Sequence, residues 1–200
     1  MSVDGPDLPW PLPDRVDLRD QLLAAYRTGR GYHDLRHLSE VLERLTELDA
    51  EASDELVLAA WFHDAVYDGD RDDEERSAFL AETELTDAGV DAGEVARLVR
   101  LTATHSPGED DLAGQALCDA DLGILAASAQ RYAEYAQGVR ADYAHIDDEG
   151  FREGRLAVLE DLLGRETLFH TDYARRVWEP RARQNLAAEM DALRASSAAG

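Results

Sequence analysis

Two histidines and a His-Asp pair stand in apolar surroundings, where a polar side chain is costly unless something binds it. His33 and His37 are four residues apart and share one face of a predicted helix. His63 and Asp64 follow the apolar run 58–62, and helical spacing turns His63 inward with Asp64 about 100° further round. A buried carboxylate needs a cationic partner or a metal ion. The rest of the sequence must supply that partner.

A second pair of carboxylates lies in the apolar segment 112–127, at Asp119 and Asp121. One of them can cap a helix, but capping does not easily accommodate both. At least one is therefore expected to meet the buried histidines. Two histidines and two aspartates suit a divalent metal ion with positions left for water and substrate. The residues alone leave Asp119 and Asp121 as competing choices for the last ligand.

The elements that must position these residues are helices. Apolar residues recur at helical spacing, strand-like alternation of useful length does not occur, and Ser53, Asp91 and Ser128 are predicted helix caps. The pattern predicts an all-α fold in a single domain over 14–200, preceded by an irregular, proline-rich arm over 1–13. The expected helical segments cover about 14–29, 33–48, 54–67, 73–88, 92–106, 112–127, 128–143, 148–163 and 179–196.

The charge and composition of the chain limit the classes of molecule that it is expected to bind. The 200 residues include 43 acidic and 20 basic ones, a formal net charge of −23. This charge argues against duplex nucleic acid, whose binding depends on neutralising phosphates. Every basic residue is arginine, so a protein group that grips a phosphate must be Arg, His or a backbone amide. One cysteine, no signal peptide and no stretch near the roughly 20 apolar residues of a membrane span predict a cytoplasmic protein without a membrane partner.

The order of these residues resembles a known signature. His37, then His63-Asp64, then Asp121 is similar to the His … His-Asp … Asp pattern of the HD superfamily of metal-dependent phosphohydrolases, and more closely to its small stand-alone subfamily of predicted phosphohydrolases. The resemblance covers roughly 14–190 and is carried by the stretches 32–37, 61–67, 74–78, 102–105, 119–122, 151–155 and 181–189. It implies an HD-type helical bundle that holds a divalent metal ion (Mn, Fe, Co, Ni, Zn or Mg). The implied metal ligands are His37, His63, Asp64 and Asp121.

The resemblance also implies catalytic residues. In the more distant cyclic-nucleotide phosphodiesterases, a His-Asn-x-x-His motif uses its first histidine as general acid. His33 has that spacing from His37, but Asp34 stands in the place of the asparagine. His33 is therefore a candidate for an acid, a substrate contact or a partner of Asp34. Asp64 is expected to take part in proton handling as well as in metal binding.

Charged residues outside the ligand set are candidates for the remaining roles. Glu75 could orient the attacking water and Arg76 could meet the phosphate, whereas the alternative is a solvated helix start. Arg155 is a further candidate for the phosphate. His105 would be needed for a second metal ion, and otherwise is an ordinary histidine at a helix end.

These features predict a metal-dependent phosphohydrolase that cleaves a small phosphate ester, nucleotides included, with metal-activated water. A net charge of −23 favours a small substrate that fits deep in the bundle over a long polyanion. One alternative is an HD-fold di-iron oxygenase, which requires a second metal ion. Another is a non-catalytic HD-like module that binds a ligand. The sequence favours no oligomeric state and no substrate within this class.

Overall fold

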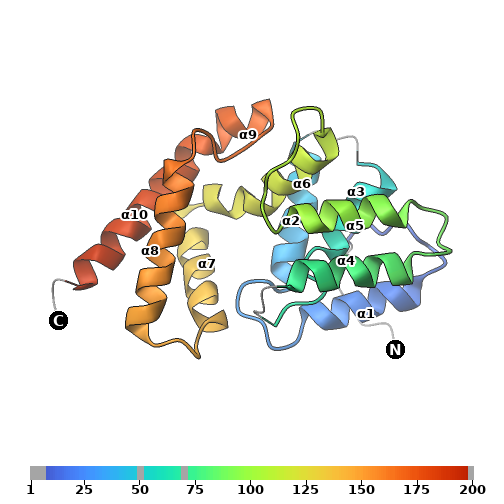
Figure 1. Cartoon of the computed structure of the whole chain (residues 1–200), viewed down its shortest axis with the longest axis horizontal. Coiled ribbons are helices and arrows are strands. Elements are labelled where there is room, and N and C mark those ends of the chain that lie inside the picture. Colours follow the sequence, from blue (N-terminus) through green and yellow to red (C-terminus); the bar gives the residue numbers. More distant parts are fainter. Residues whose placement is uncertain (1–7, 49–51, 69–71, 198–200) are drawn as a thin grey trace.

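The computed structural model describes residues 8–48, 52–68 and 72–197. Within these ranges the chain is one all-α body of ten α-helices and a 3-10 turn, with no strand (Figure 1). The prediction of an all-α fold is therefore confirmed. In the described part of the chain, no helix combines the length and the apolar character needed to cross a membrane.

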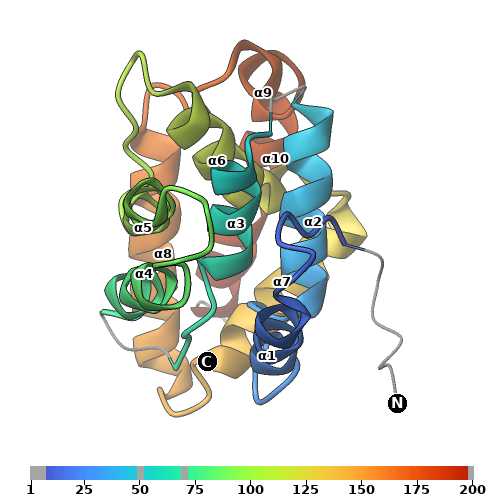
Figure 2. The same ribbon diagram turned by 90° about the vertical axis from the view of Figure 1, so that its right-hand side faces the viewer.

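The half drawn on the right of Figure 1 surrounds a core that includes the fully buried Leu58, Trp61 and Phe62. Its helices are α1 (Val16–Tyr26), α2 (Leu35–Glu47), α3 (Asp54–Phe62), α4 (Asp73–Glu84), α5 (Ala92–Leu101) and α6 (Leu112–Leu122). Figure 2 shows α3 between α4 and α5 on one side and α1 and α2 on the other. The residues 58–62 are all buried, because a short helix that is apolar on every side is stable only when it is enclosed.

The other half has its own core, built around Leu159, Phe169 and Leu186. Its helices are α7 (Ala129–Asp142), α8 (Asp148–Gly164), α9 (Asp172–Val177) and α10 (Glu179–Ser197). The 3-10 turn η1 (Gly123–Ala126) continues α6 into this half and is buried. The side-chain amide of Asn185 in α10 donates to the carbonyl oxygen atoms of Leu125 (2.8 Å) and Ala127 (3.0 Å), so a side chain ties α10 to the main chain at the junction.

Capping side chains set where the helices begin. Asp34 accepts from the amides of two residues in the first turn of α2, which fixes the start of the helix that carries His37. Side chains that cap other helices are Ser53, Asp91, Asp111, Ser128, Asp147 and Thr171. The caps predicted at Ser53, Asp91 and Ser128 are confirmed. Loss of such a cap typically costs about 1 kcal/mol.

The structure differs from the predicted elements at several places. The helices predicted over 54–67, 73–88, 92–106 and 112–127 end at Phe62, Glu84, Leu101 and Leu122, and α9 was not predicted. Residues 1–7 of the predicted arm lie outside the described residues. Its remaining part is irregular and packs on α3, with Trp10 edge-on to Trp61 at 5.0 Å and Trp61 Nε1 donating to Pro9 O at 2.8 Å. The domain boundary at residue 14 stays a prediction.

Candidate metal centre

Three helices bring four polar side chains to one buried point. His37 comes from the first turn of α2, His63 and Asp64 from the end of α3, and Asp121 from the last turn of α6. The Nε2 atoms of the two histidines are 2.9 Å apart. Asp64 Oδ2 lies 3.1 Å from Nε2 of His63 and 3.3 Å from Nε2 of His37. Asp121 Oδ1 lies 3.8 Å from Nε2 of His63 and 3.1 Å from Nε2 of His37. We call these four residues the His-Asp cluster.

The end of α3 explains how Asp64 reaches the cluster. In a continued helix the Asp64 amide would donate to the carbonyl of Ala60. That carbonyl lies 2.8 Å from the ring Nδ1 of His63, and the Asp64 amide donates to the hydroxyl of Tyr26 at 3.2 Å. The Arg30 guanidinium donates to the carbonyl oxygen of Asp64 at 2.6 Å. Asp64 therefore enters the cluster from a turn after the helix, which corrects its predicted position on the helix.

Opposite charges outweigh burial in the cluster. Burial alone opposes the charged form of each group, but the Asp64 carboxylate raises the pKa of His63 to about 9. Burial is likewise overcome at Asp64, where the imidazoles of His63 and His33 hold the pKa well below its usual range. His105 and His37 do the same for Asp121. The two carboxylates thus stay ionised, and protons on the imidazoles or a metal ion must balance them.

The donor atoms fit a divalent metal ion. Two imidazole nitrogens 2.9 Å apart cannot both carry protons that point at one another. Asp64 Oδ2 is buried and makes no hydrogen bond within the described residues. Ligand atoms of His37, His63 and Asp64 all lie within 4.8 Å of one another. Two ligands about 2.1 Å from one ion and at right angles are roughly 3 Å apart, so these three side chains can hold a metal ion.

The two aspartates of α6 point in different directions. Asp119 is fully buried, and its carboxylate accepts from the amides of His170 (2.8 Å) and Thr171 (2.7 Å). It holds the turn that leads into α9. Asp121, two residues further along the helix, faces the His-Asp cluster, because a step of two residues rotates a helical side chain by about 200°. The geometry thus places Asp121, and not Asp119, beside the histidines.

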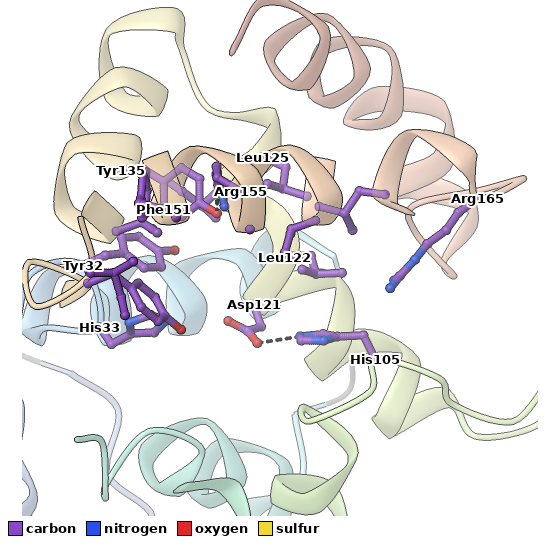
Figure 3. A pocket seen from close by; sticks show the side chains of 18 of the residues that line it. Tyr32, His33, His105, Asp121, Leu122, Leu125, Tyr135, Phe151, Arg155 and Arg165 are labelled. Carbon is purple, nitrogen blue, oxygen red and sulfur yellow. Dashed lines mark hydrogen bonds and ion pairs between the residues drawn. The ribbon is translucent and has the colours of Figure 1, made fainter. Parts of the chain in front are cut away.

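His105 supports Asp121 from a strained position. Its φ is 50°, in the left-handed region that a non-glycine residue adopts only when its surroundings hold it there. Its Nε2 lies 2.8 Å from Asp121 Oδ2 (Figure 3), and its carbonyl lies 3.1 Å from Nε2 of His170. Asp121 therefore has one oxygen toward the cluster and the other toward His105.

Replacing His105 by asparagine is expected to weaken metal binding by about 10–100-fold, the usual effect of losing a group that orients a ligand. Asparagine tolerates a positive φ, so the unfolding free energy without metal should change little. Competition against a chromogenic chelator measures the affinity. The control is His145→Asn, which changes an exposed histidine outside the His-Asp cluster. Equal metal affinities for His105→Asn and the unchanged protein would show that His105 does not position Asp121.

His33 is held beside the cluster by an acidic residue from the other half. Its Nδ1 lies 3.3 Å from Asp142 Oδ2, and its ring stacks on Tyr67 at 4.0 Å. Asp34 instead accepts from the amide of His37 at 3.1 Å. The structure thus pairs His33 with Asp142 and gives Asp34 the role of a helix cap, so the predicted alternative of a His33–Asp34 pair is wrong.

Sequence reasoning missed the residues that order the loop before α2. Asp142 accepts from the amides of Gly31 and Tyr32 as well as facing His33. A Cβ at Gly31 would lie 2.3 Å from the carbonyl of Gly138, so this close approach requires glycine. Asp142 is 110 residues from Tyr32, and no local pattern in the sequence signals a contact of that separation.

A cavity of about 680 Å³ adjoins the cluster at Asp121 (Figure 3). His33, His105 and Arg155 also line it, so four of the candidate residues face one space. Tyr32 lines it as well, and its hydroxyl is buried with no hydrogen-bond partner among the described residues. Through the cavity a small molecule can reach Asp121, the cluster residue that stands in its wall.

Comparison with known proteins identifies no relative. No protein-family model, curated protein or solved structure matches this chain. The centre therefore rests on the chemistry and geometry of its own residues.

The other predicted site residues are engaged elsewhere. Glu75 and Arg76 are exposed on α4, where Glu75 pairs with Arg100 at 2.7 Å and Arg76 pairs with two nearby aspartates. The structure does not bring either side chain into the His-Asp cluster. Arg155 lines the cavity, but its guanidinium makes a bidentate contact with Glu189 at 2.7 and 2.9 Å.

Proposed function

We propose that the protein is an HD-type metal-dependent phosphohydrolase that acts on a small phosphate ester. One observation carries the proposal. Two histidines and two aspartates, in the order of the HD signature, converge where the buried Asp64 Oδ2 has no hydrogen bond within the described residues. A divalent ion held there supplies Lewis acidity and a water molecule activated near neutral pH.

The chain's own residues supply the proton transfers. His33 is held through Nδ1 by Asp142, which leaves Nε2 to donate a proton to the ester oxygen as the alcohol departs. Asp64, through the carboxylate oxygen that the metal ion does not use, would accept the proton that the attacking water loses. His105 keeps Asp121 in place during the reaction. Each of these roles is a proposal that follows from the contacts of the side chain.

Electrostatics support a substrate with few negative charges. The net charge of −23 repels polyanions. Near the cluster, Arg155 is engaged by Glu189, and Arg30 donates to main-chain carbonyls of 33, 64 and 65. A monoester, whose phosphate meets the metal ion and the neighbouring imidazoles, fits this environment better than a polyphosphate.

Hydrolysis after metal reconstitution tests the proposal. Chelator-treated protein should regain phosphate release from at least one ester in a panel when Mn, Co, Ni, Zn, Fe(II) or Mg is added singly. Free phosphate is measured colorimetrically, and Asp64→Asn serves as the control that should stay inactive. Protein that binds about one equivalent of metal yet releases no phosphate from any ester would instead be the ligand-binding module considered above.

One observation favours a second candidate, the di-iron oxygenase. Asp121 presents Oδ1 to His37 and Oδ2 to His105, so its carboxylate lies between the cluster and a further imidazole. A carboxylate in that position is suited to bridging two metal ions. Two equivalents of iron in purified protein, together with substrate-dependent oxygen consumption, would place this candidate first.

A further inference from the structure

The cavity beside Asp121 is much larger than a phosphate group requires. Its volume of about 680 Å³ lies within the range of roughly 300–1,000 Å³ that is usual for sites of small organic molecules. Most of its wall is apolar. The apolar side chains come from the end of α6, from η1, and from α7 and α8, and include Leu122, Ile124, Leu125, Val139, Phe151 and Leu162.

The acidic side chain of the cavity wall lies at one end. Figure 3 shows Asp121 and His105 together there, with Phe151, Leu125 and the Glu189-paired Arg155 farther away and Leu122 in between. The end with Asp121 is the one that adjoins the His-Asp cluster. This arrangement suits a ligand with an anionic end and an apolar body.

Exposed apolar side chains continue the wall to the surface. Tyr143, Ile146 and Val158 are 39%, 37% and 49% exposed and all line the cavity. Apolar side chains gathered at the rim of a cavity indicate a surface that becomes covered on binding. Gly154 of α8 leaves space among them, because a Cβ built there meets no atom within 4 Å.

Tyr32 provides an independent sign of a ligand. It is 5% exposed, lines the cavity, and its hydroxyl has no hydrogen-bond partner in the described part of the chain. A tyrosine hydroxyl can donate a hydrogen bond, and this one has nothing to donate to among the described residues. A buried donor without a partner is unfavourable, and an oxygen atom of a bound ester would satisfy it.

The charged residues of the cavity argue against a second phosphate. Arg155 is engaged by Glu189, and Arg165 pairs with Asp161 at 2.9 Å near the surface. The anionic charge of the ligand is thus expected to be confined to the end at the His-Asp cluster.

We propose that the cavity binds the apolar organic group of a ligand whose phosphate lies at the His-Asp cluster. The apolar character of the organic group is inferred from the cavity walls, whereas the hydrolysis of its phosphate ester rests on the proposed function. Together they make the substrate a phosphate monoester of an apolar alkyl or aryl alcohol. Nucleotides and sugar phosphates, whose organic groups are strongly polar, are disfavoured.

Filling the cavity from α8 tests the inference. Gly154→Leu places a side chain in open space in the cavity wall. Gly164→Leu is the matched control. A Cβ at Gly164 also meets no atom within 4 Å, but Gly164 is not among the described residues that line the cavity. Both changes replace a helical glycine and favour the helix. The probes are 1-naphthylphosphonate and methylphosphonate, which resist hydrolysis, titrated calorimetrically into manganese-loaded protein.

We expect the unchanged protein to bind 1-naphthylphosphonate at least about 10-fold more tightly than methylphosphonate, from the usual effect of apolar groups in a pocket. Gly154→Leu should remove roughly that factor for the naphthyl compound alone, while Gly164→Leu keeps it. Equal affinities for the two phosphonates, or equal effects of the two variants, would overturn the inference.

Rates of phosphate release separate this inference from the proposed function. Naphthyl preference in binding, without phosphate release from any ester, would retain the apolar cavity and reject the hydrolase. Equal kcat/KM values for cyclohexylmethyl phosphate and methyl phosphate, which both release a primary alcohol, would retain the hydrolase and reject the apolar cavity. A kcat/KM at least about 10-fold higher for the cyclohexylmethyl ester, lost in Gly154→Leu, supports both.

Discussion

Replacing Asp64 by asparagine should empty the metal centre while the helices remain intact. The change removes the ionised Oδ2 that lies within 3.3 Å of both imidazoles, and an amide is a much weaker ligand than a carboxylate. Metal at 100 times its dissociation constant should stabilise the unchanged protein by about 2.7 kcal/mol. This corresponds to a rise in melting temperature of roughly 5–10 °C for a chain of this size. Asp64→Asn should show no rise in calorimetry and no bound metal in elemental mass spectrometry.

Asp119→Asn is the matched control for this experiment. Asp119 is as buried as the cluster histidine His37, but its two oxygen atoms accept main-chain amides from 170 and 171. Asparagine leaves one of those amides facing another donor, which should lower the unfolding free energy by about 1–3 kcal/mol. Metal content and the metal-dependent rise in melting temperature should survive. If Asp119→Asn loses the metal and Asp64→Asn keeps it, the assignment of the centre is wrong.

Glu189→Leu should destabilise the protein more than any other single change considered above. Glu189 holds Arg155 in a bidentate contact with side-chain exposures of 13% and 7%, and it accepts from the hydroxyl of Tyr132 at 2.6 Å. Its loss leaves a buried guanidinium without a counter-charge. Breaking such a pair typically costs about 3–5 kcal/mol. Urea unfolding followed by circular dichroism measures the change.

Two further variants complete this experiment. The double change Glu189→Leu with Arg155→Met should recover most of the lost stability, because apolar replacement of both partners removes the uncompensated charge. Glu160→Leu, which breaks the exposed pair with Arg194, should cost only about 0–1 kcal/mol. If the double variant hydrolyses the ester at the rate of the unchanged protein, Arg155 contributes to stability and not to substrate binding. Loss of hydrolysis at normal metal content and stability would support its predicted phosphate contact.

The helices could be predicted because apolar spacing and capping residues are local signals. The end of α3 could not, since it depends on Arg30 and Tyr26, which lie 34 and 38 residues away from Asp64. The Leu58–Tyr67 pattern alone continues the helix. The structure ends it five residues earlier because main-chain groups of 60 and 64 bond to side chains instead of each other.

The candidate site was predictable as a set of residue types but not as an arrangement. Histidines and aspartates in apolar segments indicate the His-Asp cluster from sequence alone. Glu75 shows the limit of such reasoning, because an acidic residue in the first turn of a helix has the same pattern whether it is catalytic or paired with Arg100. The support of His33 by Asp142 depends on contacts between the two halves of the chain.

The contact between His63 Nδ1 and the carbonyl of Ala60 makes part of the centre insensitive to mutation of its neighbours. Every amino acid at position 60 offers the same carbonyl, so the tautomer and orientation of His63 are encoded by the main chain. Asp121, by contrast, depends on the imidazole of His105, which a single codon change can remove. The orientation of His63 therefore does not depend on which residue stands at position 60. The orientation of Asp121, which meets the cavity, depends on a side chain and can change through a single substitution.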